Sequence, residues 1–152
     1  MTSRMNRDGN GKRLVRGQVL VEFSIVAFLS LILLLSIVEI SRMTLVYTTI
    51  ANAARAGARY SIVHGGTRTG SGVDGPSGPA ANPPQVVTVI KNFASAGLLT
   101  TSSLVITVGY PGASNAPGQL VSVTVVYPYD PLTAYFPFRV RLGSTSQGVI
   151  AF

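Results

Sequence analysis

Residues 18–40 form a long apolar run near the start of the chain. No charged residue occurs between Phe23 and Val38, where only small serine hydroxyls interrupt the apolar side chains. Residues 18–40 in helical form would measure about 34 Å, which exceeds the hydrocarbon core of a bilayer, about 30 Å thick. The pattern therefore predicts one transmembrane helix.

The helical pattern continues beyond this run. Apolar residues recur at the i, i+3, i+4 spacing of one helix face, polar residues line the opposite face, and no proline occurs before Gly75. We expect one helix from Gln18 to Ile62, with its later part packed against a globular domain. The expected apolar stripe comprises Met43, Val46, Tyr47, Ile50, Ala54 and Gly57, and the polar face comprises Thr48, Asn52, Arg55 and Arg59.

The remainder of the chain predicts a small domain behind a linker. Residues 63–84 are rich in Gly, Pro, Ser and Thr, which predicts a flexible loop. Residues 85–152 predict a short helix that ends at a left-handed Gly97, followed by an antiparallel sheet. The apolar face of the short helix is expected at Val86, Val89, Ile90 and Phe93. Strands are expected at 104–110, 119–127 and 139–142, with 149–152 as a further candidate edge. The fold class is thus α+β.

Basic residues cluster ahead of the apolar run. Of the 12 Lys and Arg, five lie within residues 1–16, where Asp8 is the only acid, and three (Arg42, Arg55 and Arg59) closely follow the run. The positive-inside bias places the N-terminus in the cytoplasm and the C-terminal domain outside it. A cleaved secretory signal peptide fits less well, because its apolar region spans only about 7–15 residues.

Composition and charge exclude several function classes. The net charge is +7, but the basic residues outside the head are dispersed and Trp is absent, so we expect no nucleic-acid surface. The chain has no cysteine for a disulfide, a thiolate nucleophile or a zinc site. His64, the only histidine, is expected to be solvated in its loop, and Asp74 and Asp130 are too separated for an acid/base pair. A calcium site at Asp74 is a minor alternative. We expect no enzyme activity, catalytic residue, metal, cofactor or small-molecule substrate.

An aromatic segment begins at the end of the second expected strand. It comprises Tyr127, Tyr129, Tyr135, Phe136 and Phe138. These side chains are expected to belong to the core and a turn, and the alternative is an exposed contact surface for other subunits.

Two acids flank the apolar run. An ionised carboxylate at a helix centre in a bilayer costs about 2.5 kcal/mol or more, so Glu22 calls for a partner or for extension to the interface. If the chain were cut after Gly17, the new ammonium of Gln18 would lie one helical turn away, in the same chain or in a neighbouring one. Glu39, at the other edge, is expected to form an ordinary exposed pair with Arg42.

The residues at the start of the run resemble a known processing site. Gly17, four further residues, then Glu22 and Phe23 ahead of an apolar run is similar to the prepilin cleavage site of the Tad (Flp) branch of type IV pili. The resemblance implies that a membrane prepilin peptidase cleaves between Gly17 and Gln18. The glutamate is then the fifth residue of the mature chain.

Two further stretches extend the resemblance. Glu39–Arg42 and Ala53–Arg59 look like the helix of TadE-like pseudopilins, so the similarity covers about residues 16–60. Ala56 departs from the family, which often has an acid there. The helix packing motif implied by the resemblance comprises Arg55, Gly57 and Arg59.

The resemblance implies a structural role in pilus assembly. The protein would be a pseudopilin or minor-pilin-like component of a Tad (Flp) type IV pilus or a related secretion machine, with a pilin-like outer domain and a role in adhesion or secretion. Its partners would be the prepilin peptidase, other pilin or pseudopilin subunits, the Tad secretion machinery and the bacterial cytoplasmic (inner) membrane. The expected parts are a cleaved basic leader at 1–17, the helix at 18–62, the loop at 63–84 and the outer domain at 85–152. The alternative is a single-pass anchored extracytoplasmic binding protein that joins no filament.

Overall fold

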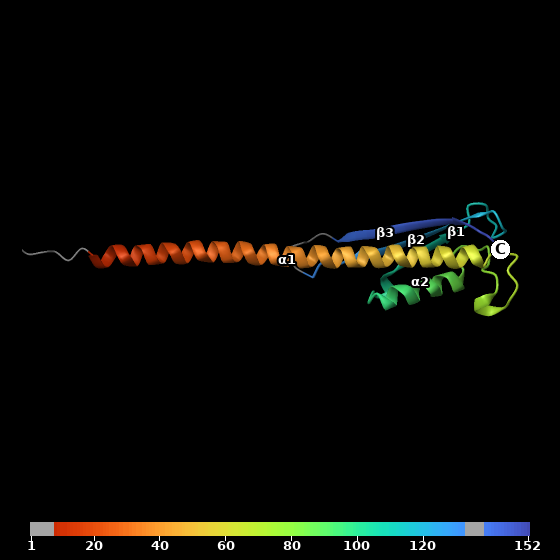
Figure 1. Ribbon diagram of the computed structural model, residues 1–152, viewed down its shortest axis with the longest axis horizontal. Helices are drawn as coiled ribbons and strands as arrows, with labels where there is room; N and C mark the ends of the chain where they lie inside the picture. The colour runs from red at the N-terminus through yellow and green to blue at the C-terminus, as the bar shows by residue number, and fades with distance from the viewer. Residues whose placement is uncertain (1–7, 133–138) are drawn as a thin grey trace, which may run out of the picture. The chain divides into compact units, whose positions relative to one another are not determined.

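The computed structural model describes residues 8–132 and 139–152 and divides into two compact units, Met1–Ile40 and Ser41–Phe152. Helix α1 spans Asp8–Val63 (Figure 1). It begins ahead of the expected Gln18, because no proline interrupts the sequence between Asp8 and the apolar run. The first unit, where it is described, consists of this helix alone.

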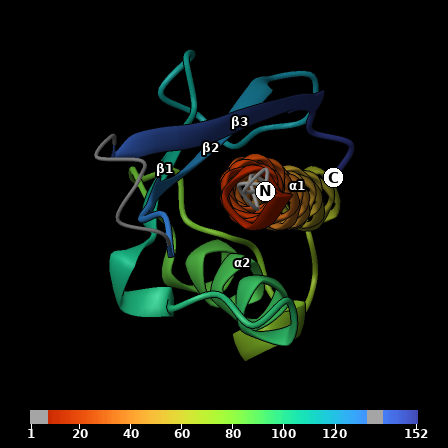
Figure 2. The ribbon, with the colours of Figure 1, turned by 90° about the vertical axis from the view of Figure 1, so that its left-hand side faces the viewer.

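The second unit confirms the predicted α+β class. After α1 follow η1 (Gly72–Asp74), α2 (Pro84–Ala96), η2 (Thr101–Ser103), β1 (Val105–Gly109), β2 (Leu120–Tyr129) and β3 (Val140–Val149). The strands form an antiparallel sheet in the order β1-β2-β3. The final part of α1 and the shorter helix α2 both pack on one face of this sheet (Figure 2).

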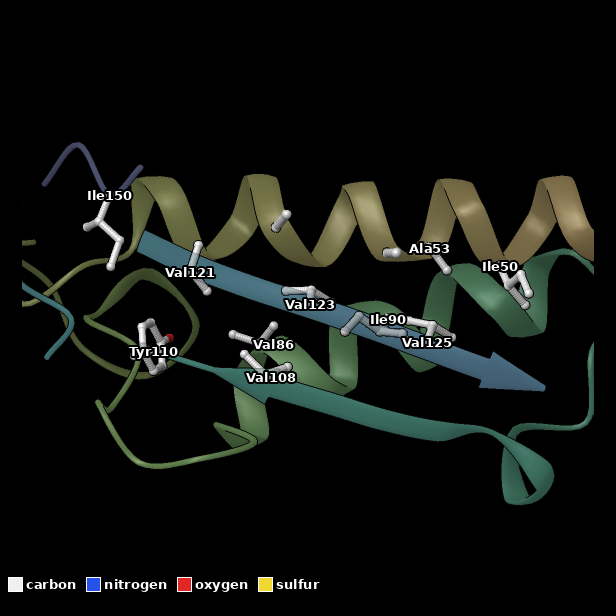
Figure 3. Close-up of a cluster of buried hydrophobic side chains, with 12 residues drawn as sticks. Ile50, Ala53, Val86, Ile90, Val108, Tyr110, Val121, Val123, Val125 and Ile150 are labelled. Carbon is white, nitrogen blue, oxygen red and sulfur yellow. The ribbon is translucent and has the colours of Figure 1, made fainter. Parts of the chain in front are cut away.

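One apolar core holds the second unit together (Figure 3). Side chains alternate along a strand, so Val121, Val123 and Val125 of β2 all face the helices and are fully buried. The other core residues are Ile50, Ala53, Ala54 and Ala58 from α1, Val86 and Ile90 from α2, and Val108, Tyr110 and Ile150. Because α1 presents mainly alanines here, its backbone approaches the sheet closely.

The buried face of α1 differs from the expected stripe at one position. Tyr47 is 49% exposed, whereas its neighbour Val46 is buried and Ala51 and Ala53 are buried as well. Tyr47 lies one residue beyond the face that turns toward the sheet, and alanines fill the contact instead. Its inclusion in the apolar stripe was therefore wrong.

The sheet is longer than the sequence pattern indicated. The expected strand at 139–142 lies largely in β3, which pairs with β2 from Tyr129↔Val140 to Leu120↔Val149. Of the expected edge at 149–152, only Val149 belongs to this strand, and residues 150–152 follow it. The intervening residues are small and polar, so they show no hydrophobic alternation. Strand β2 also continues through Pro128, which is tolerated because the β1 ladder ends at Val126.

Helix α2 buries Val86 and Ile90 as expected, but its buried face continues through Ala94 and not through Phe93. Ala94 is fully buried and Phe93 is 43% exposed. Gly97 has φ −86°, so it is not the left-handed residue. Leu98 adopts the left-handed conformation instead, with φ 61°. Glycine is required at 97 for another reason, because a Cβ there would lie 2.3 Å from Cγ2 of Thr49 on α1.

The segment between α1 and α2 makes specific contacts within the second unit. His64 is only 8% exposed, and its ring stacks on Tyr60 with the ring centroids 3.8 Å apart. The Ser77 hydroxyl donates a hydrogen bond to the His64 carbonyl oxygen at 2.7 Å. The expectation of a solvated His64 was wrong, because i, i+4 spacing at the helix end places its ring on Tyr60.

The last turn of α1 is tied to the strand that closes the sheet. The Ala151 amide donates a hydrogen bond to the Ile62 carbonyl oxygen at 2.9 Å, and the Ile150 amide donates to the Gln119 carbonyl oxygen at 2.9 Å. The residues that follow β3 therefore bridge the end of α1 and the start of β2.

The aromatic segment divides between buried and partly buried positions. Tyr129 is 2% exposed and Tyr127 packs against the core, as the core interpretation predicted. Tyr135, Phe136 and Phe138 lie outside the described residues.

The core assignment on α2 leads to a stability test. Replacing Ile90 with alanine should lower the free energy of unfolding by about 2–5 kcal/mol, because a fully buried side chain leaves a cavity. The matched change Phe93→Ala should cost clearly less, since Phe93 is 43% exposed. Denaturant unfolding of the full chain in detergent measures both. Equal losses would contradict the observed orientation of α2.

Candidate processing and assembly site

The residues of the expected cleavage site lie together on α1, within the first unit. Residues four apart on a helix are neighbours on its surface, so Gln18 and Glu22 are adjacent one turn apart. With Gly17, Val21 and Ile25 they line one shallow hollow on the helix. A carboxylate thus lies beside the position that would carry a new chain terminus.

The backbone at Gly17 is open to an approaching protein. A Cβ added there would meet no atom within 4 Å, and Gln18 and Glu22 are exposed. Phe23 is 69% exposed. No contact among the described residues therefore requires a glycine at position 17.

The apolar run presents its side chains outward on every side of the helix. Leu20, Leu33 and Val38 are 60–68% exposed, and most of the other large apolar side chains of the run are more than half exposed. The hydroxyls of Ser24 and Ser36 donate hydrogen bonds to the carbonyl oxygens four residues earlier, at 2.7 and 2.8 Å. A helix that is apolar all round with its polar groups satisfied internally suits a lipid environment.

The described residues contain one helix that is long and apolar enough to cross a membrane. It spans Gly17–Val63, with a mean hydropathy of 2.6 over its most apolar window. A single such helix near the N-terminus indicates single-pass anchoring. Glu22 carries the only ionisable side chain between Gln18 and Val38, so it is the one site in this stretch that can recognise an opposite charge.

The three residues of the expected helix packing motif point in different directions. Arg55 and Arg59 are exposed, and Nη1 of Arg55 donates to Oδ1 of Asn52 at 3.0 Å. Gly57 is buried, and a Cβ there would lie 2.6 Å from Cγ1 of Ile90. Within the second unit, Gly57 contacts the core while the two arginines lie on the solvent side.

At the far edge of the apolar run, the expectation of an exposed Glu39 was wrong. Glu39 is only 7% exposed. Arg42 is exposed, and its Nη1 lies 3.5 Å from the Tyr129 hydroxyl and 3.4 Å from the Asp130 carbonyl oxygen. Its guanidinium carbon also lies 5.1 Å from the centroid of the Tyr129 ring, a cation–π distance. The sequence offered no indication of these contacts, which join residues more than eighty positions apart.

Comparison with known proteins identifies a family for part of the chain. No curated protein and no solved structure matches the chain. A family model described as TadE-like protein matches residues 17–59, which confirms the resemblance found over residues 16–60. This part of the chain is therefore similar to the TadE-like family, whose members are structural, pilin-like proteins associated with the Tad pilus.

Proposed function

We propose that the protein is a pseudopilin or minor-pilin-like subunit in the assembly of a Tad (Flp) pilus or a related secretion machine. One observation carries the proposal. The TadE-like match begins at Gly17, where an open glycine backbone directly precedes the adjacent pair Gln18 and Glu22. A plain membrane anchor has no use for this arrangement.

In this proposal a prepilin peptidase removes residues 1–17 by cleaving between Gly17 and Gln18. The leader holds five basic residues and one acid, so its loss lowers the net charge from +7 to +3. The cut creates an ammonium at Gln18 that lies one helical turn from the Glu22 carboxylate. The mature helix then keeps residues 18–62, followed by the loop at 63–84 and the outer domain at 85–152.

The pairing of these two charges would direct assembly. Opposite charges attract more strongly in a low dielectric than in water, so Glu22 of one subunit can select the terminus of an adjacent subunit within the membrane. The exposed apolar side chains around them, Phe23 among them, would pack between neighbouring helices. The same helix surface would thus contact lipid in the bilayer first and neighbouring subunits in the assembly afterwards.

The proposed topology places the N-terminus in the cytoplasm. Five basic residues precede the apolar run, and three closely follow it. The positive-inside bias keeps the more basic flank of a span in the cytoplasm. The outer domain would then face the outside of the inner membrane, where other pilin subunits and the Tad machinery meet it.

The alternative is a single-pass anchored protein whose outer domain binds a surface partner without entering a filament. It requires neither cleavage at Gly17 nor a charge at Glu22. The experiments below therefore separate the two functions.

Cleavage is tested by the N-terminus of the membrane-extracted protein. N-terminal sequencing should begin at Gln18 in cells that contain the peptidase. Gly17→Val should leave the leader attached, because the added side chain obstructs the peptidase and not the fold, given the open space at this position. The control Gly11→Val, within the leader, should be cleaved normally. An intact N-terminus in the wild type would contradict the proposal.

Topology is tested with reporters fused after Phe152. A reporter that is active only outside the cytoplasm should give activity, and one that is active only in the cytoplasm should give none. The expected direction follows from the excess of basic residues before the span. The reverse result would place the outer domain in the cytoplasm and would overturn the proposed assembly.

Glu22→Gln tests whether the carboxylate has a partner. The uncharged side chain should leave insertion and cleavage intact but abolish assembly, because an unpaired buried ammonium costs about 3–5 kcal/mol. The control Glu22→Asp keeps the charge and should retain part of the assembly. Processed protein in the membrane and assembled pili or secreted product are measured in parallel. Normal assembly by Glu22→Gln would favour the simple anchor.

A further inference from the structure

Strand β3 forms a long open edge of the sheet. In the order β1-β2-β3 it has a neighbouring strand on one side only among the described residues (Figure 2). It pairs with β2 over its whole length, Val140–Val149, without a break in the register. We propose that this edge binds an extended segment of a different protein of the pilus assembly as a further strand. The inference rests on the proposed function and names the kind of neighbour that the subunit takes.

The hydrogen bonds at the opposite edge of the sheet show which main-chain groups of β3 point outward. The Val108 amide donates to Oδ1 of Asn82 at 2.6 Å, and the Val108 carbonyl oxygen accepts from the Asn82 amide at 3.0 Å, so the main-chain groups of Val108 point away from β2. Neighbouring residues of a strand direct these groups to opposite sides, and the observed register carries this alternation through β2 to β3. The β3 residues whose groups point away from β2 are therefore Arg141, Gly143, Thr145, Gln147 and Val149.

The two edges of the sheet differ in their protection. Strand β1 has only five residues, and Asn82 bonds both main-chain groups of Val108 at its edge. Native edge strands are commonly protected by charges, prolines or bulges, and β3 has none of these between Leu142 and Val149. Within the part of the chain that the structure describes, the outward N–H and C=O groups of β3 have no hydrogen-bond partner. An edge of this kind is a template for strand addition.

The direction of β3 limits how two copies of this chain could pair. The end of β2 lies near the start of α1 in the second unit, where the Tyr129 hydroxyl is 3.5 Å from Nη1 of Arg42, and the residues after β3 bond to Ile62. Strand β3 is antiparallel to β2, so it runs in the same direction as α1. Subunits anchored in one membrane have parallel α1 helices, which excludes antiparallel pairing of their β3 strands.

Parallel pairing of two copies does not fit this edge either. An outward residue of one strand would have to lie opposite an inward residue of the other, because it bonds to the two residues on either side of its opposite residue. A twofold axis along the strands would instead place each residue opposite its own copy. The β1 edge of a second copy is short and already bonded to Asn82. The added strand therefore comes from a different chain.

The side chains along the edge indicate the chemistry of that strand. Opposite residues of neighbouring strands share one face of the sheet, and the outward residues Thr145 and Gln147 are uncharged. Arg141 is exposed and forms no ion pair within the described residues, where the Asp130 carboxylate pairs with Arg139 instead. The segment that fits is uncharged and rich in β-branched residues, with one carboxylate placed beside Arg141.

Amide hydrogen exchange tests whether the edge is open before assembly and closed after it. In the full chain in detergent, the amides of Thr145 and Gln147 should exchange about 100-fold faster than those of Ser144 and Ser146, which bond to β2. In the assembled machine the outward amides should slow to the rates of their neighbours. Slow outward amides in the free chain would show that the edge is already covered. Fast outward amides after assembly would show that it stays unpaired, and either result overturns the inference.

A proline at an outward position tests the contribution of the edge. Thr145→Pro removes an N–H group that the second unit does not use, so processing and the free energy of unfolding should stay close to the wild type, whereas assembled pili or secreted product should be lost. The control Thr145→Val keeps the N–H group and should assemble. Normal assembly by Thr145→Pro would contradict strand addition. If this variant is less stable, Gln147→Pro tests the next outward amide, and the exchange comparison decides without any substitution.

A photo-crosslinker identifies the origin of the added strand. Benzoylphenylalanine in place of Gln147 should crosslink to a different chain in assembling cells, and Thr145→Pro should abolish this product while Thr145→Val retains it. A crosslinked dimer of this chain, or a product that survives Thr145→Pro, would overturn the inference. N-terminal sequencing reports on the proposed function separately. An unprocessed wild type contradicts that function, whereas a processed Thr145→Pro chain that assembles normally contradicts only strand addition.

Discussion

The small-residue face of α1 is the contact on which the second unit depends. Ala53, Ala54 and Ala58 are buried against the sheet, and Gly57 leaves room for Ile90 and Val123, which a Cβ would meet at 2.6 and 3.3 Å. Larger side chains would separate the helix from β2 and open the core. The same helix carries large apolar side chains before Ile40, where nothing in the described first unit covers them. One helix thus has two kinds of surface along its length, and each kind suits a different environment.

The local elements of this fold were predictable from the sequence. A long run without charge or proline predicts a helix whatever surrounds it, and β-branched runs predict β1 and β2. The details depend on contacts between distant segments. Phe93 and Ala94 both fit the apolar periodicity of one helix face. Which of the two side chains is buried depends on where the neighbouring elements lie. Likewise, β3 has small polar residues at its centre, so its length follows from pairing with β2 and not from its own pattern.

The two candidate sites show the same distinction. Gly17, Gln18 and Glu22 lie within one and a half turns of helix, so a linear pattern was sufficient to find them. The open edge of β3 follows from the order of the strands and from the bonds between Asn82 and Val108, and neither of these has a local indicator. The burial of Glu39 could not be predicted either, because no residue near it in the sequence indicates that its side chain is buried.

The hydrogen bond between Ala151 and Ile62 has a consequence for the transmission of force. It ties the last turn of α1 to the residues that follow β3, and β2 runs alongside this part of α1 (Figure 3). A pull applied to α1 from its membrane end would therefore load the ladder between β2 and β3 along the direction of the strands. In that shear geometry the hydrogen bonds of the ladder carry the load together, whereas a pull across the strands would break them one after another. The long pairing of β3 would then act as a mechanical clamp for the second unit when α1 is under tension.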